Sequence, residues 1–324
     1  MARPLVLSCL KELRPLALLT MAEGRRTGAA KAPVTANGWG NGRAAGEEVV
    51  FSGEGGPNLN GFLARPNFSA ASGAGRNGVV LSHGFPGTSQ KAGSPSSGFP
   101  ELAIRLAAET GAVVLTFDFR GTGLSAGDFS LAGWQADLAA AIGTLRAVPG
   151  IERTWLVGFA AGGTLSICAA GEDVSIAGVA AFSPLAEFAE RAGETRRASA
   201  QAKAAAGAAR ARGYPPEPGA WARDVKEVRP SLLVANIPPR PLLIVHGAGD
   251  DVVPITDARE LADAADASSE LRILAGAGHA LVHDPRAIAL LLGWFDRHLG
   301  SAAWLPEPSQ ASEPAPPSQP AQAL

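Results

Sequence analysis

Short apolar runs alternate with helical patterns through the middle of the chain. Several of these runs are continuous rather than alternating, which is typical of strands covered on both faces. The predicted strands span residues 48–51, 78–81, 112–117, 154–157, 176–182, 241–245 and 271–274. The predicted helices span residues 102–109, 131–147, 257–265 and 288–298. Asp284, in a cap position and followed by Pro285, is the start signal of the last helix. This alternation predicts an α/β fold with a mostly parallel, doubly wound sheet.

One segment interrupts the alternation. Residues 187–212 form a polar, alanine-rich helical pattern, and a proline cluster and a second short helical pattern at 221–228 follow it. Ligands of open α/β sheets bind beyond the carboxyl ends of the strands. An insertion over residues 185–230 that leaves from such an end therefore predicts a short helical lid. A surface excursion without a function is the alternative.

The two ends of the chain differ in composition from its middle. Residues 22–45 are rich in Gly, Ala and Arg, and residues 301–324 are rich in Pro, Ser and Ala. Such segments bury too little apolar surface to offset the entropy lost on ordering. We therefore expect a disordered extension at 1–45, one folded domain at 46–300 and a disordered tail at 301–324.

Composition narrows the classes of partner. The 324 residues carry a formal net charge of −2, so we expect neither nucleic acid nor a membrane surface as a partner. Cys9 and Cys168 lie far apart and lack the spacing of metal ligands, which predicts no metal site, no disulfide and a cytoplasmic location. Lys11, Glu12 and Arg14 interrupt the apolar N-terminal residues, which argues against a secretory signal. Nothing in the sequence calls for an organic cofactor.

The most informative motif surrounds Ala160. Residues 156–164 read Leu-Val-Gly-Phe-Ala-Ala-Gly-Gly-Thr, and they join a predicted strand to a helix. The nucleophile elbow, Gly-x-Ser-x-Gly, occupies this context, and its strained turn requires small neighbours. Gly158 and Gly162 meet that requirement, whereas Ala160 occupies the position of the nucleophilic serine.

Two backbone N–H groups near this elbow are candidate oxyanion donors. His83, Gly84 and Phe85 follow the strand at 78–81, and such a turn can present the N–H of Phe85. Ala161 begins the elbow helix, so its N–H has no partner within the helix. Together the amides of Phe85 and Ala161 predict an oxyanion hole.

The acid and base candidates follow the last two strands. Asp250 lies in the loop after residues 241–245, and His279 lies in a small-residue loop after residues 271–274. The chain order of nucleophile position, acid and base is the order found on this kind of sheet. Asp251 is the alternative acid, but the spacing from His246 and Gly247 favours Asp250.

Taken together, these motifs resemble the α/β-hydrolase superfamily, and within it the single-domain serine aminopeptidase-like and dienelactone hydrolase-like proteins. The resemblance covers residues from about 46 to 300 and rests on residues 83–87 and 118–125, the elbow, and the Asp250 and His279 loops. It implies an α/β-hydrolase fold and acyl transfer without a cofactor, in which His279 takes the serine proton and Asp250 holds the imidazole. Ala160 departs from this pattern, because an alanine cannot form an acyl-enzyme.

Three functions remain open at this point. The chain could be a hydrolase-lineage protein with weak or no ester or amide hydrolysis, or a pseudo-hydrolase that binds a small ligand. It could also be a His–Asp enzyme that acts without a covalent step. In each case the expected partner is a small-molecule acyl substrate or ligand, and the oligomeric state is unknown. A deliberate serine-to-alanine exchange is a further explanation of Ala160.

Other polar residues are expected to be structural or remote. Ser125, in a flexible glycine-rich loop, and Ser166, further along the elbow helix, are two weaker candidates to replace the missing hydroxyl, and Ser166 should point elsewhere. The residues expected to hold turns and loops are His83, His246, Asp118 and Arg120.

Overall fold

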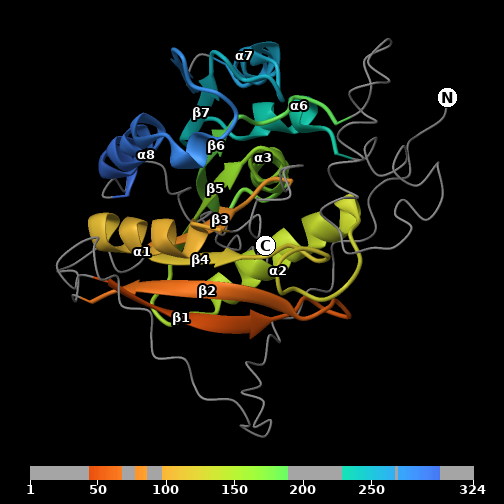
Figure 1. Ribbon diagram of the computed structural model, residues 1–324, viewed down its shortest axis with the longest axis vertical. Helices are drawn as coiled ribbons and strands as arrows, with labels where there is room; N and C mark the ends of the chain where they lie inside the picture. The colour runs from red at the N-terminus through yellow and green to blue at the C-terminus, as the bar shows by residue number, and fades with distance from the viewer. Residues whose placement is uncertain (1–43, 68–76, 86–96, 189–227, 267–268, 300–324) are drawn as a thin grey trace, which may run out of the picture.

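The computed structural model describes residues 44–67, 77–85, 97–188, 228–266 and 269–299. Within them, eight strands form one sheet in the order β1-β2-β4-β3-β5-β6-β7-β8 (Figure 1). β1 and β2 are antiparallel to each other, β2 is antiparallel to β4, and β3 to β8 run parallel. The strands are β1 (Ala44–Phe51), β2 (Leu59–Pro66), β3 (Asn77–Ser82), β4 (Val113–Phe117), β5 (Arg153–Phe159), β6 (Ile176–Phe182), β7 (Leu242–Gly247) and β8 (Glu270–Leu274). The predicted doubly wound, mostly parallel sheet is confirmed.

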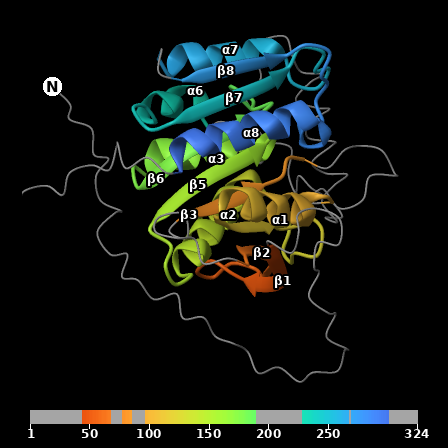
Figure 2. The same ribbon diagram turned by 90° about the vertical axis from the view of Figure 1, so that its left-hand side faces the viewer.

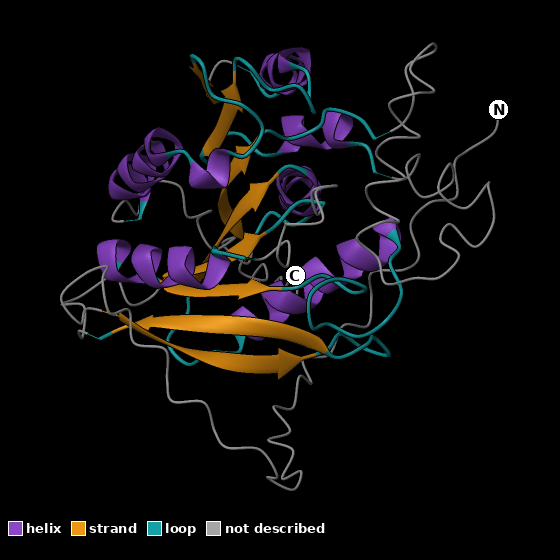
Figure 3. Cartoon of the chain, viewed as in Figure 1, coloured by secondary structure: helices purple, strands orange, loops and turns teal. Residues whose placement is uncertain are grey.

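Helices cover both faces of this sheet, as Figures 1 and 2 show. Side chains of β5 alternate between two cores: Leu156 belongs to the core that includes residues of α2, α3 and α7, and Val157 belongs to the core that includes residues of α1 and α8. Figure 3 shows the resulting layers, with the strands between the helices. The helices are α1 (Phe99–Thr110), α2 (Leu131–Arg146), α3 (Ala161–Glu172), the short α6 (Pro230–Leu233), α7 (Ile255–Ala264) and α8 (Pro285–His298).

Every predicted strand and every predicted helix within the described residues is present, but the sequence pattern does not predict β2. Its residues alternate poorly because Asn60 and Gly61 interrupt the apolar positions. The Gly55-Gly56-Pro57 turn before it is the signal that could have indicated a hairpin with β1. The predicted start of α8 is close to the observed one: the Asp284 carboxylate accepts a hydrogen bond from the N–H of Arg286, at 2.9 Å, as an N-cap does.

The far end of α3, the helix that begins at the elbow, is held by Arg240. This side chain is buried, and burial lowers the pKa of its guanidinium. All five of its N–H donors reach backbone carbonyls, so the group remains hydrogen-bonded despite its burial. The accepting carbonyls belong to Ala170, Asp173, Ile176, Asn236 and Ile237. Arg240 thereby ties the end of α3 to the residues before β6 and β7.

The predicted helices at 187–212 and 221–228 lie almost entirely outside the described residues, as do the predicted extensions at 1–45 and 301–324. The lid and the domain limits therefore stay predictions. In the described ranges, no helix combines the length and the apolar character that a membrane span requires.

Candidate active site

Ala160 joins the end of β5 to the start of α3 in an unusual backbone conformation. Its φ is 49° and its ψ is −120°, a region that residues with a Cβ rarely adopt. The Ala160 N–H donates to the carbonyl of Phe182 at 2.7 Å, and the Ala160 carbonyl accepts from the N–H of Thr164 at 3.0 Å. The strained turn is therefore fixed from both sides, by β6 and by α3. Ala160 is only half-buried.

Close backbone approach explains the glycines of the motif. A Cβ on Gly158 would lie 2.4 Å from the carbonyl carbon of Gly162, and a Cβ on Gly162 would lie 2.5 Å from the carbonyl oxygen of His83. A Cβ on Gly84 would lie 2.7 Å from the Cβ of Ala160. The loop after β3 therefore lies directly against the elbow, and glycine is needed where the two segments meet.

The two proposed oxyanion donors belong to these touching segments. Phe85 follows Gly84, and Ala161 is the first residue of α3. The Ala161 nitrogen lies 3.5 Å from where a Gly84 Cβ would be. The N–H of a first helical residue has no acceptor within its helix. Gly84, the residue before Phe85, therefore lies against the start of α3, and the oxyanion role of the two amides stays a prediction.

Asp250 and His279 form a hydrogen-bonded pair. Nδ1 of His279 lies 2.9 Å from Oδ2 and 3.1 Å from Oδ1 of Asp250. Burial alone would raise the pKa of Asp250, but hydrogen bonds from His279 and from the N–H groups of Val252 and Val253 lower it to about 2. The ionised carboxylate can only accept, so Nδ1 carries the proton and the lone pair of the neutral imidazole is on Nε2. That is the tautomer a general base needs.

The loops that carry this pair are joined to each other. The Gly249 N–H donates to the carbonyl of Ala277 at 2.8 Å, and the Ala248 N–H donates to the carbonyl of Leu274 at 2.9 Å. A Cβ on Gly247 would lie 2.5 Å from the Ala277 carbonyl oxygen. The two loops are thus one rigid unit after β7 and β8, which fixes the orientation of both side chains.

The structure selects Asp250 rather than its neighbour as the partner of His279. The Asp250 side chain is fully buried, whereas Asp251 is exposed. A second imidazole also lies nearby: Nε2 of His246 donates to the Val253 carbonyl at 3.0 Å and lies 3.5 Å from Oδ2 of Asp250. His246 therefore braces its own loop, as expected.

The elbow, the acid and the base share one edge of the sheet. β5 to β8 run parallel, so Ala160, Asp250 and His279 all follow carboxyl ends of strands. β6 lies between β5 and β7 in the sheet, which separates the two strand ends by about 10 Å. An imidazole attached to Asp250 must extend across the end of β6 to approach the elbow.

His83 and the loop 118–125 support this edge from the side. The buried His83 ring donates from Nδ1 to the Gly84 carbonyl at 2.7 Å and accepts at Nε2 from the Phe119 N–H at 3.2 Å. Burial lowers the pKa of His83, so the ring stays neutral. It is a turn residue, as expected, and it links the turn that carries Phe85 to the next loop.

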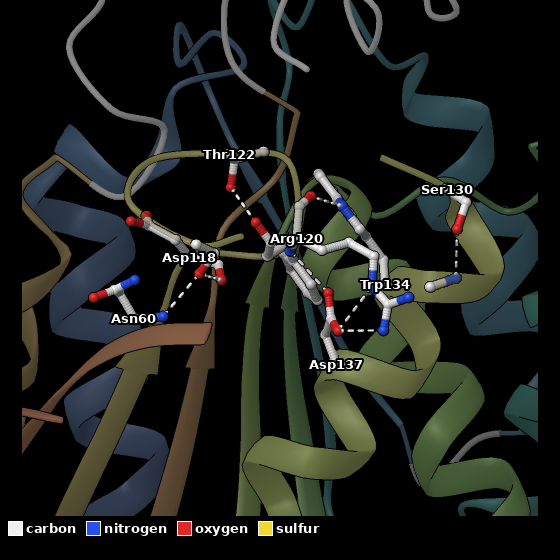
Figure 4. Close-up of polar contacts among 10 residues, drawn as sticks. Asn60, Asp118, Arg120, Thr122, Ser130, Trp134 and Asp137 are labelled. Atoms are coloured by element: carbon white, nitrogen blue, oxygen red, sulfur yellow. Dashed lines mark hydrogen bonds and ion pairs between the residues drawn. The ribbon is translucent and has the colours of Figure 1, made fainter. Parts of the chain in front are cut away.

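The loop 118–125 is held by a dense set of polar contacts (Figure 4). The Asp137 carboxylate accepts from the backbone N–H of Arg120 at 2.8 Å and from its Nε and Nη2 at 2.9 and 2.7 Å. Trp134 Nε1 donates to the Arg120 carbonyl at 3.1 Å, and Asp118 accepts from the Leu124 N–H at 2.8 Å. Arg120 and Asp118 therefore pin this loop, as predicted.

Neither serine weighed as a replacement hydroxyl is free to react. Ser125 is buried; its Oγ donates to the Asp118 carbonyl at 2.5 Å and accepts from the Asn60 N–H at 2.8 Å. This weaker candidate is therefore excluded, because these bonds hold the side chain between β2 and the end of β4. Ser166 donates to the Gly162 carbonyl at 2.7 Å within α3, so it points elsewhere, as expected.

Comparison with known proteins agrees with this fold. Residues 79–290 match the alpha/beta hydrolase family, and the chain therefore belongs to that family. No curated protein matches the chain significantly.

Similar solved structures include an α/β hydrolase, GrgF, from Penicillium sp. sh18, at 21% identity and a TM-score of 0.58, over 78% of this chain and 99% of that one. An acetyl xylan esterase from Paenibacillus sp. R4 is 17% identical with a TM-score of 0.59, over 79% and 84% of the two chains. A hypothetical protein from Pseudomonas aeruginosa is 20% identical with a TM-score of 0.58, over 80% and 95%. At these identities the likeness establishes the fold.

Proposed function

We propose that this protein is an α/β hydrolase of the serine-hydrolase type, with a site for a small acyl compound, in which Ala160 reduces ester hydrolysis to a weak residual level or abolishes it. The observation that carries the proposal is the His279–Asp250 pair at 2.9 Å, at the same sheet edge as a strained elbow that ends in a methyl group. The acetyl xylan esterase with a similar fold supports the proposal of ester chemistry at this site.

Each proposed residue has one role in this chemistry. Nε2 of His279 is the general base, Asp250 holds its tautomer, and the amides of Phe85 and Ala161 stabilise the oxyanion. Only the nucleophile is missing. Loss of the nucleophile in a serine protease lowers kcat by about 10⁶ and leaves about 10³ to 10⁴ over the uncatalysed reaction, through oxyanion stabilisation and binding.

A pseudo-hydrolase that binds a small acyl ligand is the alternative that the same geometry supports. The oxyanion donors and the imidazole could recognise a carbonyl or carboxylate group without converting it. This alternative predicts tight binding of acyl compounds with no turnover. Under either function, a small molecule is the proposed partner and the cytoplasm the proposed location.

Restoring the hydroxyl tests the proposal. We expect Ala160→Ser to raise kcat/KM for p-nitrophenyl butyrate at least about 100-fold over the unmodified protein, because the remaining machinery would then have its nucleophile. Ala160→Gly is the matched control: glycine accepts the positive φ but adds no hydroxyl, so it should leave hydrolysis weak.

The base must act in the restored enzyme. We expect the double variant Ala160→Ser, His279→Ala to lose the gain. Unmodified protein that already turns over as fast as Ala160→Ser would contradict the proposal, and so would an Ala160→Ser variant that folds but hydrolyses no p-nitrophenyl ester.

A further inference from the structure

Each proposed oxyanion donor shares a planar peptide unit with a carbonyl group. The N–H of Ala161 belongs to the same unit as the carbonyl of Ala160, and the N–H of Phe85 belongs to the same unit as the carbonyl of Gly84. In a planar trans peptide, the C=O and N–H bonds point in opposite directions. A group that fixes the direction of the carbonyl therefore also fixes the direction of the donor N–H.

The carbonyl of Ala160 accepts hydrogen bonds from both the backbone and the side chain of Thr164. The Thr164 nitrogen lies 3.0 Å from this oxygen, as part of the first turn of α3, and the Thr164 Oγ1 lies 3.2 Å from it. The Thr164 side chain is fully buried. The hydroxyl is thus a second donor to the carbonyl of the residue whose φ is 49°.

A residue far along the chain fixes the hydroxyl of Thr164. Leu185, in the segment after β6, donates its backbone N–H to Thr164 Oγ1 at 2.8 Å. The hydroxyl keeps its single proton for an acceptor of its own. Two carbonyl oxygens are within reach, that of Ala160 at 3.2 Å and that of Leu185 at 3.4 Å. The shorter contact is the one to the elbow, so the hydroxyl joins the elbow to the segment after β6.

The peptide unit of the other donor is held in the same way. The carbonyl of Gly84 accepts from Nδ1 of the buried His83 at 2.7 Å, and Nε2 of that ring accepts from the Phe119 N–H at 3.2 Å. In both cases a buried side chain donates to the carbonyl of the donor peptide, and a backbone N–H from another segment fixes that side chain. This arrangement occurs at both peptides that carry the proposed donors, which favours a role in orienting them.

We propose that Thr164 is a positioning residue of the oxyanion hole, which orients the Ala161 N–H through the Ala160 carbonyl. The inference rests on the proposed function, because it concerns ester hydrolysis at the same site. A strained backbone persists only where surrounding bonds hold it, and the Thr164 hydroxyl supplies one of those bonds at Ala160. A hydrogen-bonded carbonyl also polarises its peptide unit, which makes the N–H of that unit a stronger donor.

The test compares Thr164→Val with Thr164→Ser in the Ala160→Ser background, where the proposed function predicts measurable turnover. Valine has nearly the shape of threonine but lacks the hydroxyl, whereas serine keeps it. Loss of an oxyanion donor lowers kcat about 10²–10³-fold, and a misdirected donor retains part of its effect, so we expect Thr164→Val to lower kcat for p-nitrophenyl butyrate about tenfold. KM should stay unchanged, and Thr164→Ser should retain most of kcat.

Inhibition by a boronic acid separates this role from a structural one. The adduct of butylboronic acid with the introduced hydroxyl places an oxygen where the oxyanion forms, so its inhibition constant reports the strength of the donors. We expect Thr164→Val to raise this constant about tenfold, in parallel with the loss in kcat. A replacement that only destabilised α3 would lower the temperature of thermal unfolding and leave the inhibition constant unchanged.

Ser166→Ala is the matched control. Ser166 Oγ also donates to a carbonyl four residues earlier in α3, at 2.7 Å, but this carbonyl is that of Gly162, whose peptide unit carries the N–H of Gly163. Removing this buried hydroxyl should lower stability and leave kcat and the inhibition constant unchanged. If Thr164→Val does not fold, Thr164→Ala carries the same expectation, because it leaves room for a water at the Leu185 N–H.

Three results would overturn the positioning role of Thr164. They are an unchanged kcat and inhibition constant in Thr164→Val, an equally large effect of Ser166→Ala, and a loss in Thr164→Ser as large as that in Thr164→Val. Ala160→Ser would be active in all three cases, so the proposed function would stand. An Ala160→Ser variant that folds but hydrolyses no ester would remove the proposed function and this inference with it.

Discussion

The loop 118–125 and the edge formed by Ala160 and Ser183 both follow carboxyl ends of parallel strands. They differ in how completely their polar groups are hydrogen-bonded. In the loop, the charged side chains of Asp118 and Arg120 and the hydroxyl of Ser125 are all hydrogen-bonded. At the edge, Ala160 and Ser183 both have positive φ, and the Ser183 hydroxyl is buried without a partner in the described structure. The hydrogen bonds stabilise the loop, whereas the edge contains backbone strain and a buried hydroxyl that no described residue satisfies.

His83 connects the two regions. Its ring accepts from the Phe119 N–H, while its neighbour Gly84 lies against Ala160. A rigid loop therefore supports the turn that carries the proposed oxyanion donor Phe85. The comparison predicts that changes in the loop act mainly on stability, and that changes at the edge act mainly on activity or relieve strain.

The largest stability effect should come from Asp137→Ala. The Asp137 side chain is 2% exposed and forms an ion pair with Arg120 at 2.7 Å. Removing one partner of a buried pair costs about 3–5 kcal/mol, and we expect a loss of about 3 kcal/mol here, because the remaining Arg120 side chain is 20% exposed and is partly solvated. Urea unfolding should show this loss. A loss below about 1 kcal/mol would mean that the loop does not depend on this pair, and the contrast between the regions would fail.

Asp250 should make a smaller and pH-dependent contribution. Its pKa is lowered from 3.8 to about 2 in the folded protein, which corresponds to about 2 kcal/mol of stability. Because the folded pKa is the lower one, this stability is present in full above about pH 4 and is lost as the pH falls toward 2. The gap in unfolding free energy between the unmodified protein and Asp250→Asn should therefore narrow from pH 6 to pH 3.

Asp251→Asn is the matched control for this prediction. It removes a carboxylate one residue away that is exposed and has no hydrogen bond to His279. Its effect on the unfolding free energy at pH 6 should be clearly smaller. A gap for Asp250→Asn that stays constant over the same pH range would show that ionisation of this group is not coupled to folding.

The smallest effect, and one of opposite sign, is expected at the elbow. A non-glycine residue at such a φ destabilises the folded protein by about 1–3 kcal/mol. Glycine removes this strain, but it loses more backbone entropy on folding, which offsets part of the gain. Ala160→Gly should therefore raise the unfolding free energy by about 1 kcal/mol. Ala169→Gly, in the interior of α3, should lower it by about 0.5–1 kcal/mol. If both changes destabilised the protein equally, the elbow would carry no strain.

The fold was largely predictable from the sequence, because buried parallel strands need continuous apolar runs and the chain supplies them in strands such as β4, β6 and β7. β2 was not predicted, because its own residues show no clear apolar pattern and it is stabilised by pairing with β1 and β4. At the candidate site, the elbow, Asp250 and His279 could be named because each carries a local motif. Thr164 could not, because the bond that fixes its hydroxyl comes from Leu185, 21 positions further along the chain.

By itself, the sequence determined which short-range requirements are met: small residues around Ala160, an N-cap at Asp284, and an acid and a base after consecutive strands. Each of these features depends on neighbours within a few positions of the chain, so the identities of those residues are enough to predict it. Only the tertiary structure decided that Asp250 rather than Asp251 meets His279, that Ser125 is tied to β2, and that Ser183 lies beside the elbow. Each of those outcomes depends on strand register and loop packing between segments far apart in the chain, which no local pattern encodes.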